Sequence, residues 1–127
     1  MRILWTQLTI SIKKIYDMKT TQKEYETFIK SSQSILNLLG LTDFDVYYEM
    51  KNIGDEAEVN YDCTAMNAVI TCCTTHGKFF DPVKAGKHEA LHLLLATLKV
   101  EATSRSTTDY SLDQAVHGII HRLEKVL

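Results

Sequence analysis

Apolar and polar residues follow a regular pattern after residue 20, and this pattern predicts a helix followed by three short strands. The helix is expected over 21–39, because Thr21-Gln22-Lys23-Glu24 matches a capping box and apolar residues recur near helical spacing until Gly40. The strands are expected where apolar and polar positions alternate or form a short apolar run, at 44–50, 57–62 and 67–73. A turn at 52–56 joins the first two strands, and a loop over 74–80 follows the third.

The second half of the chain predicts two more helices. Asp81-Pro82 is a strong helix start, since Asp can accept hydrogen bonds from free N–H groups and Pro suits the first helical position. This helix is expected to reach Val100 and, with leucines around much of its circumference, to be central and largely buried. Ser111-Leu112-Asp113-Gln114 is a second capping-box pattern and opens a final helix. The fold class predicted by this order is α+β with a three-stranded, mainly antiparallel sheet.

The first 19 residues fit more than one structure. Residues 8–12 alternate as in a strand, whereas residues 12–16 equally fit one face of a helix. Polar residues interrupt the apolar run and no small-residue cleavage site follows it, so we do not expect a signal peptide. We predict an N-terminal extension over 1–19 and a single domain over 20–127. One hypothesis is that Met18 is the natural start and that the residues before it are an appendage.

Composition narrows the classes of partner. A net charge of −2 and a pI near 6.2 do not favour nucleic acid or an anionic membrane as the main partner. No segment approaches the roughly 18 apolar residues of a membrane span. Cys63, Cys72 and Cys73 are odd in number, include an adjacent pair and form no C-x-x-C motif, which favours free thiols in a reducing compartment. We therefore expect a cytoplasmic protein.

The most informative motif is His88-Glu89-Ala90-Leu91-His92, which reads H-E-x-x-H within the helix predicted from residue 82. Residues four apart lie on one face of a helix, so His88 and His92 can direct two imidazoles at one metal ion. Glu89 is rotated about 100° from His88 and can stand beside the metal as a general base. The motif thus predicts a zinc (Zn²⁺) site with His88 and His92 as ligands and Glu89 as the catalytic residue.

A catalytic zinc site needs a third protein ligand and one open position, and the residues leave that ligand's identity open. Positions 95 and 98 are leucines, so the longer H-E-x-x-H-x-x-G-x-x-H motif is absent and the ligand must come from further along the chain. In order of preference the candidates on the final predicted helix are His117, Asp113 and His121. If His117 binds the metal, Asp113 one turn earlier could hold its other ring nitrogen.

From about residue 22 to residue 127, the chain resembles the compact zinc-dependent peptidase-like proteins of bacteriophages and prophages, which belong to the zincin superfamily. The matching segments are F-D-V-Y-Y-E-M at 44–50, N-A-V-I-T at 67–71, H-E-A-L-H-L-L-L at 88–95 and A-V-H-G-I-I-H-R-L at 115–123. It is also distantly similar to SprT-like and IrrE/ImmA-like peptidase domains. The resemblance implies a minimal zincin-like fold, zinc bound by His88, His92 and the residue at 117, and, for a phage protein, the cytoplasm of a bacterial host. The family usually has Glu where this chain has His117, and zinc accepts either residue type.

These residues predict hydrolysis of peptide bonds in a peptide or protein substrate. Zinc lowers the pKa of its bound water to about 7 and polarises the scissile carbonyl, while Glu89 moves a proton from the water to the leaving amine. Tyr110 and His76 are candidates for the donor that stabilises the oxyanion, because both lie in predicted loops beside the metal-binding elements. The alternative is a non-catalytic zinc-binding or protein-interaction module that retains the peptidase fold, and the presence of Glu89 favours catalysis over it.

Overall fold

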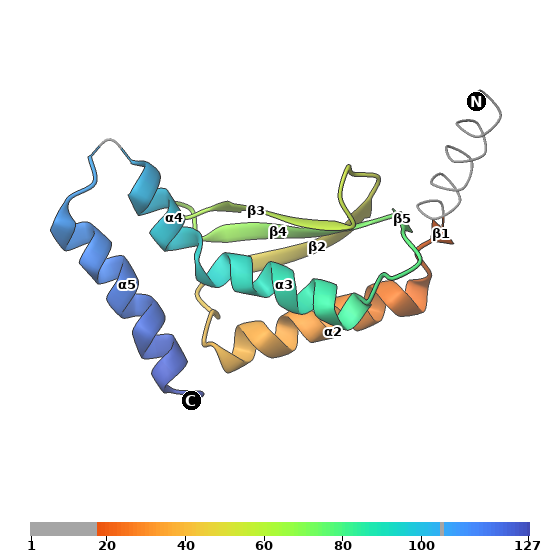
Figure 1. The fold of residues 1–127 in the computed structure, drawn as a ribbon, viewed down its shortest axis with the longest axis horizontal. Coiled ribbons are helices and arrows are strands. Elements are labelled where there is room, and N and C mark those ends of the chain that lie inside the picture. The colour runs from red at the N-terminus through yellow and green to blue at the C-terminus, as the bar shows by residue number, and fades with distance from the viewer. Residues whose placement is uncertain (1–17, 105) are drawn as a thin grey trace, which may run out of the picture.

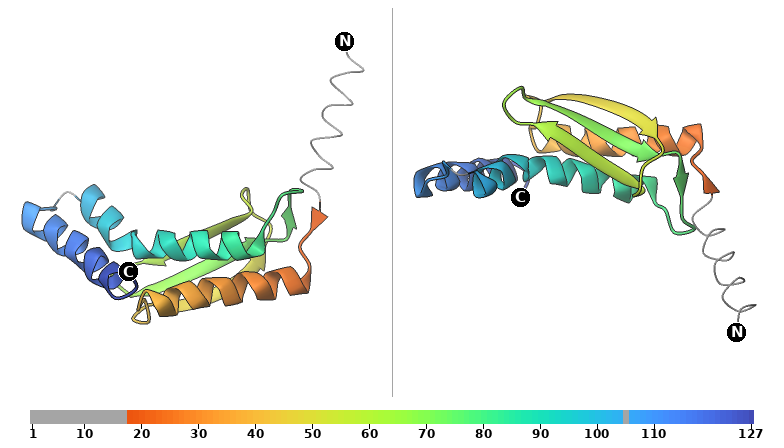
Figure 2. Two further views of the ribbon diagram at one scale, coloured as in Figure 1. Left: turned by 60° about the horizontal axis from the view of Figure 1, so that its bottom comes forward. Right: turned by 90° about the horizontal axis from the view of Figure 1, so that it is seen from above.

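The computed structural model describes residues 18–104 and 106–127, and it contains a three-stranded sheet packed against helices (Figure 1). In chain order the elements are β1 (Met18–Lys19), α2 (Gln22–Leu38), β2 (Asp45–Lys51), β3 (Ala57–Asp62), β4 (Asn67–Cys73), β5 (Thr75–His76), α3 (Pro82–Leu94), α4 (Ala96–Thr103) and α5 (Asp109–Glu124). Helices α2 and α3 lie along the same face of the sheet, and α5 and β1 lie at opposite ends of the molecule (Figure 2). The expected α+β class is confirmed. The strand, helix and signal-peptide interpretations of residues 1–17 lie outside the described residues.

Helix α2 forms where the capping box predicts it. The Thr21 hydroxyl accepts a hydrogen bond from the Glu24 N–H at 3.1 Å, and the Glu24 carboxylate accepts one from the Thr21 N–H at 2.9 Å. Just after the helix, Gly40 has a φ of +67°, a conformation that glycine adopts without a steric penalty. Phe28 and Leu36 lie on one stripe of the helix and are buried, so this stripe packs into the core.

The sheet has one antiparallel and one parallel pair of strands, so it is mixed rather than mainly antiparallel. Strand β4 lies between β2 and β3, parallel to β2 and antiparallel to β3. The turn at 52–56 therefore does not close a hairpin but carries the chain past the position that β4 occupies. Strand β4 is the most completely buried of the three, which agrees with its apolar sequence and its central position. Among the described strands, β3 has one partner and forms an edge of the sheet.

Side chains alternate across the sheet and place one row against the helices. Ile70 of β4 is completely buried and lies opposite Tyr48 of β2 and Val59 of β3. The Tyr48 hydroxyl donates a hydrogen bond to the Ser32 hydroxyl oxygen of α2 at 3.0 Å, which identifies this row as the one that faces the helices. Glu58, one position before Val59, belongs to the alternate row.

Gly86 allows α3 to lie directly against α2. A Cβ atom at this position would lie closer than 3.0 Å to the Phe28 carbonyl oxygen and 3.1 Å from the Ser32 backbone nitrogen. Beside this contact, the Ser31 hydroxyl donates a hydrogen bond to the Val83 carbonyl oxygen at 2.6 Å. The absence of a side chain at one position thus determines how closely the helix that carries H-E-x-x-H approaches its neighbour.

The prediction of a single helix over 82–100 is wrong, because the structure divides this segment into α3 and α4 at Leu95. The residues at the break include neither Gly nor Pro. Ala96 directly after it is completely buried, so α4 changes direction with a small side chain in the core. The expectation of a helix buried on most sides also fails, since Leu91 and Leu95 remain 38% and 47% exposed.

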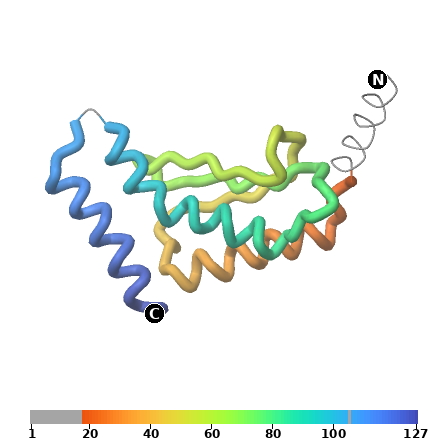
Figure 3. Tube along the Cα trace, in the orientation of Figure 1, coloured from red at the N-terminus to blue at the C-terminus, as the bar shows by residue number. Residues whose placement is uncertain are grey.

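Helix α5 begins three residues earlier than predicted, because its N-cap is Thr108 and not Ser111. The Thr108 hydroxyl accepts a hydrogen bond from the Ser111 N–H at 3.1 Å, and the Ser111 hydroxyl oxygen accepts one from the Thr108 N–H at 3.0 Å. Near the other end of α5, Arg122 donates to the Gly40 carbonyl oxygen and lies 3.4 Å from an oxygen of Asp43. These contacts hold the helix at the end of the molecule away from β1 (Figure 3).

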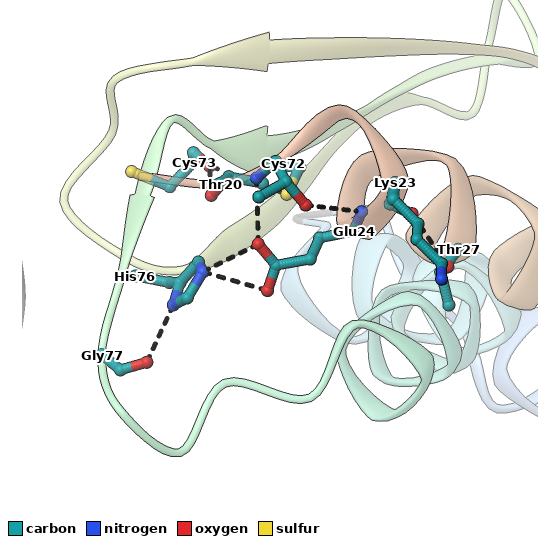
Figure 4. Close-up of polar contacts among 9 residues, drawn as sticks. Thr20, Lys23, Glu24, Thr27, Cys72, Cys73, His76 and Gly77 are labelled. Carbon is teal, nitrogen blue, oxygen red and sulfur yellow. Dashed lines mark hydrogen bonds and ion pairs between the residues drawn. The ribbon is translucent and has the colours of Figure 1, made fainter. Parts of the chain in front are cut away.

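A buried histidine ties the start of α2 to the segment that leads into α3. His76 is 6% exposed and belongs to β5, where it pairs with Met18 of β1. Its Nε2 atom lies 3.1 Å from Oε2 of Glu24, and its Nδ1 atom lies 2.8 Å from the Gly77 carbonyl oxygen (Figure 4). Its ring also stacks on that of Phe80. The sequence pattern predicts a loop here instead of β5, because the partner of β5 among the described strands, β1, is far away in the sequence.

The three cysteines carry free thiols, as expected. Burial raises the pKa of the Cys72 thiol to about 11, and the neighbouring Cys73 thiol contributes to the rise. Within the described ranges, no helix combines the length and the apolar character needed to cross a membrane.

Candidate active site

A groove of about 890 Å³ runs between the edge strand β3 and the helices α3 and α4. The turn at 52–56 and α4 lie towards opposite ends of α3 (Figure 1), and residues of both line the groove. The motif residues His88, Glu89 and His92 all line it. Its remaining lining residues are Asp55, Glu56, Ala57, Glu58, Val59, Tyr61, Ala85, Leu95, Leu98, Lys99 and Ala102.

The two histidines of the motif converge as the helical spacing predicts. Asp81 caps α3 by accepting hydrogen bonds from the N–H groups of Val83 and Lys84. About two and three turns further on, the helix presents both imidazole rings on one face. The Nε2 atoms of His88 and His92 lie 3.0 Å apart, and the rings meet edge to face. Two nitrogens bound to one tetrahedral zinc ion at about 2.05 Å would be roughly 3.3 Å apart. The pair therefore suits a shared zinc ion with little adjustment.

Glu89 is the buried member of the motif. Its side chain lines the groove while the residue is only 6% exposed, and within the described part of the chain it makes no hydrogen bond or ion pair. Burial raises the pKa of its carboxyl group above the ordinary value, the His88 ring lowers it, and the carboxylates of Glu58 and Asp55 raise it further. A carboxylate with a raised pKa and no fixed partner can accept a proton from a molecule in the groove.

The structure does not bring a third ligand to the two histidines. His117, Asp113 and His121 are all exposed on α5 and do not line the groove. The His117 ring lies 3.4 Å from the main-chain carbonyl oxygen of Asp113, not from its carboxylate, and 6.4 Å from the His121 ring. Over residues 18–104 and 106–127, no three His, Cys, Asp or Glu side chains are close enough together to hold a metal ion.

The direction of α5 explains why these residues lie apart from the motif. The residues of α5 that turn inward, such as Ala115 and Ile119, line a small cavity with Leu93 and Leu94 of α3. On the α-helix, Leu94 lies about 160° away from His92, so α5 packs on the side of α3 that faces away from the groove.

Three acidic residues of the groove, Asp55, Glu56 and Glu58, are not identified by the sequence patterns. Asp55 lies in the turn before β3, and Glu58 lies on β3 itself. Glu58 lies at a polar position of the alternating pattern over 57–62, and the position of β3 at the sheet edge brings it to the groove. The available signal was the high density of acidic residues over 55–58.

The two residues considered as oxyanion donors lie elsewhere. His76 is buried in β5, and both of its ring nitrogens already have partners in Glu24 and Gly77. Tyr110 is 73% exposed on the first turn of α5. Neither residue lines the groove, so neither expectation is met in this structure.

Comparisons with known proteins add no relative: no family model, curated protein or solved structure matches this chain.

Proposed function

We propose that this protein is a zinc-dependent metallopeptidase that hydrolyses a peptide or protein substrate in the groove beside β3. The observation that carries the proposal is the arrangement of H-E-x-x-H. The imidazoles of His88 and His92 converge with their Nε2 atoms 3.0 Å apart, and the buried carboxyl group of Glu89 opens on the same groove. Zinc held there would polarise the scissile carbonyl and acidify the attacking water. His88 and His92 would hold the ion, whereas His117, the third ligand predicted from the sequence, does not line the groove in this structure.

Glu89 would act as the general base and then as the general acid. It accepts the proton of the water whose oxygen attacks the carbonyl carbon, and it returns a proton to the leaving nitrogen as the peptide bond breaks. The groove walls remove this carboxyl group from bulk water, which raises its pKa towards the working pH of such a base.

The free edge of β3 would hold the substrate in an extended conformation. In the antiparallel ladder with β4, Cys73 donates a hydrogen bond to the Glu56 carbonyl oxygen, so every second residue from Glu56 onwards is bonded to β4. The intervening residues Ala57, Val59 and Tyr61 therefore direct their N–H and C=O groups to the free edge, and all three line the groove. An extended peptide can pair with these groups by strand addition.

Metal content and hydrolysis together test the proposal. Protein purified without chelators or metal-affinity columns should contain about one zinc per chain by elemental analysis. The His88→Ala variant should lose the metal, and Glu89→Gln should keep it while hydrolysis falls by at least about a hundredfold. His117→Ala, with His121→Ala as its matched control on the same helix, tests the third ligand. Wild-type protein that takes up no zinc on titration would refute the catalytic proposal.

One observation favours the alternative, a non-catalytic zinc-binding or protein-interaction module. A separation of 3.0 Å also suits a hydrogen bond between one protonated and one unprotonated imidazole nitrogen, which needs no bound metal and no turnover. In that case Glu89→Gln would leave every measured property unchanged except stability. A structural zinc ion, in contrast, would be revealed if chelation unfolded the domain.

A further inference from the structure

We propose that the groove selects substrates with a lysine or arginine side chain at the end formed by the turn at 52–56. This inference rests on the peptidase function proposed above and names the class of substrate. It begins from the charges along the groove, which are distributed unequally between its two ends.

The end of the groove near the turn is acidic. Asp55, Glu56 and Glu58 line it, and none of them forms an ion pair with a cation among the described residues. Glu58 accepts one long hydrogen bond, 3.4 Å, from the side-chain amide of Asn60. Three carboxylates within four positions repel one another, and a cationic side chain placed among them would relieve that repulsion.

The end of the groove formed by α4 has a different character. Leu95, Leu98 and Ala102 give it apolar walls, and Lys99 is the cationic side chain among the groove-lining residues. A substrate that spans the groove would therefore meet carboxylates at one end and apolar side chains with a positive charge at the other. A peptide with its own cation at the acidic end and apolar side chains at the α4 end complements both.

Glu89 provides a second and independent indication that a ligand enters between the two ends. It is more than nine-tenths buried, it lines the groove, and it has no protein partner among the described residues. No fully buried side-chain oxygen lacks a partner among the described residues, so the unpaired carboxylate oxygens of Glu89 keep contact with the groove. A carboxylate directed into the groove without a protein partner indicates a site for a polar group of a bound molecule. The free edge of β3 connects this point to the acidic end through the backbone groups of Ala57 and Val59.

The test uses eight-residue peptides in which a single lysine, at a different position in each peptide, is the only charged side chain. Each is compared with the same peptide in which uncharged norleucine replaces the lysine. Zinc-loaded wild-type protein should cleave the lysine peptide of at least one position roughly fivefold faster in kcat/KM than its norleucine counterpart. The difference should shrink as salt is raised, because these carboxylates are at least partly exposed.

Two double variants separate the acidic end from general charge effects. Asp55→Asn with Glu58→Gln should reduce the lysine preference to about one. The control, Asp45→Asn with Glu26→Gln, removes the same charge from exposed positions away from the groove and should leave the preference unchanged. Equal rates for lysine and norleucine at every position, or a preference that survives in the groove variant, would overturn the inference.

Binding distinguishes a failure of this inference from a failure of the proposed function. The same peptides, labelled with a fluorophore, are titrated with the Glu89→Gln variant and followed by anisotropy. One outcome is that wild-type protein cleaves none of the peptides, while lysine peptides still bind more tightly than norleucine peptides and lose that advantage in the Asp55→Asn, Glu58→Gln variant. In that outcome the groove selects lysine, and the peptidase proposal fails. If neither cleavage nor binding prefers lysine, the inference is refuted.

Discussion

Replacement of Gly86 by alanine should destabilise the protein, although Gly→Ala in the middle of a helix usually stabilises it by about 1 kcal/mol. The reason is the close approach of α2. The new methyl group would lie closer than 3.0 Å to the Phe28 carbonyl oxygen, 3.1 Å from the Ser32 nitrogen and 3.2 Å from the Ser31 Cβ atom. The two closest of these are backbone atoms, so rotation of a side chain cannot make room and the helices must separate.

The expected cost follows from these contacts. Overpacking of a well-packed core costs about 1–3 kcal/mol, and the upper part of that range applies where backbone must move. After subtraction of the gain in helix propensity, Gly86→Ala should lower the free energy of unfolding by about 2 kcal/mol. Urea denaturation followed by circular dichroism measures this value, provided that the slope with denaturant is unchanged.

Gly118 supplies the matched control. It lies in α5, and a Cβ atom built there would meet no heavy atom within 4 Å. Gly118→Ala should therefore show the ordinary stabilisation of up to about 1 kcal/mol. If Gly86→Ala is as stable as wild type, or shifts in the same direction as Gly118→Ala, then the reasoning from close helix packing is wrong.

Three further outcomes can be measured. Hydrogen bonds from Thr21 and from His76 hold the pKa of the Glu24 carboxyl below its ordinary 4.5, so its contribution is present above that pH and is lost as the pH falls through the folded-state pKa. The stability advantage of wild type over Glu24→Gln should accordingly shrink in urea unfolding between about pH 6 and pH 3, and an advantage independent of pH would contradict the pKa direction. Cys72, completely buried and with a pKa raised to about 11, should react with iodoacetamide at pH 8 only after unfolding, and mass spectrometry that finds it modified in native protein would exclude this burial. Phe28→Ala should cost about 3–5 kcal/mol in the same urea assay, and a loss below about 1 kcal/mol would mean that Phe28 is not a core residue.

Much of the secondary structure could be predicted because its signals are local. The reciprocal hydrogen bonds of Thr21 and Glu24 belong to four consecutive residues, and α2 begins where they predict. Strands β2, β3 and β4 follow from alternation or from a short apolar run. The bend at Leu95 has no such signal, because neither Gly nor Pro marks it and the residue after it, Ala96, is buried in the core. For the same reason β5, which exists through its pairing with β1, could not be recognised.

The candidate site also combines features that local sequence predicts with features that depend on distant contacts. Convergence of His88 and His92 is a property of one helix and follows from their spacing. The position of His117 depends on how α5 packs against α3, and the polarity of α5 alone could not determine that direction. Asp55 and Glu58 reach the groove because β4 lies between β2 and β3, which leaves β3 at the edge. Strand order is set by pairing across the sheet, and a single sequence carries only weak information about it.

The central position of β4 also has a consequence for synthesis of the chain. Strands β2 and β3 leave the ribosome first, but each pairs with β4 and not with the other. Eleven residues separate the end of β3 from the end of β4, which corresponds to roughly a second of translation. During that interval the nascent segment holds two strands without their native partner, so the sheet forms as a unit once β4 has emerged.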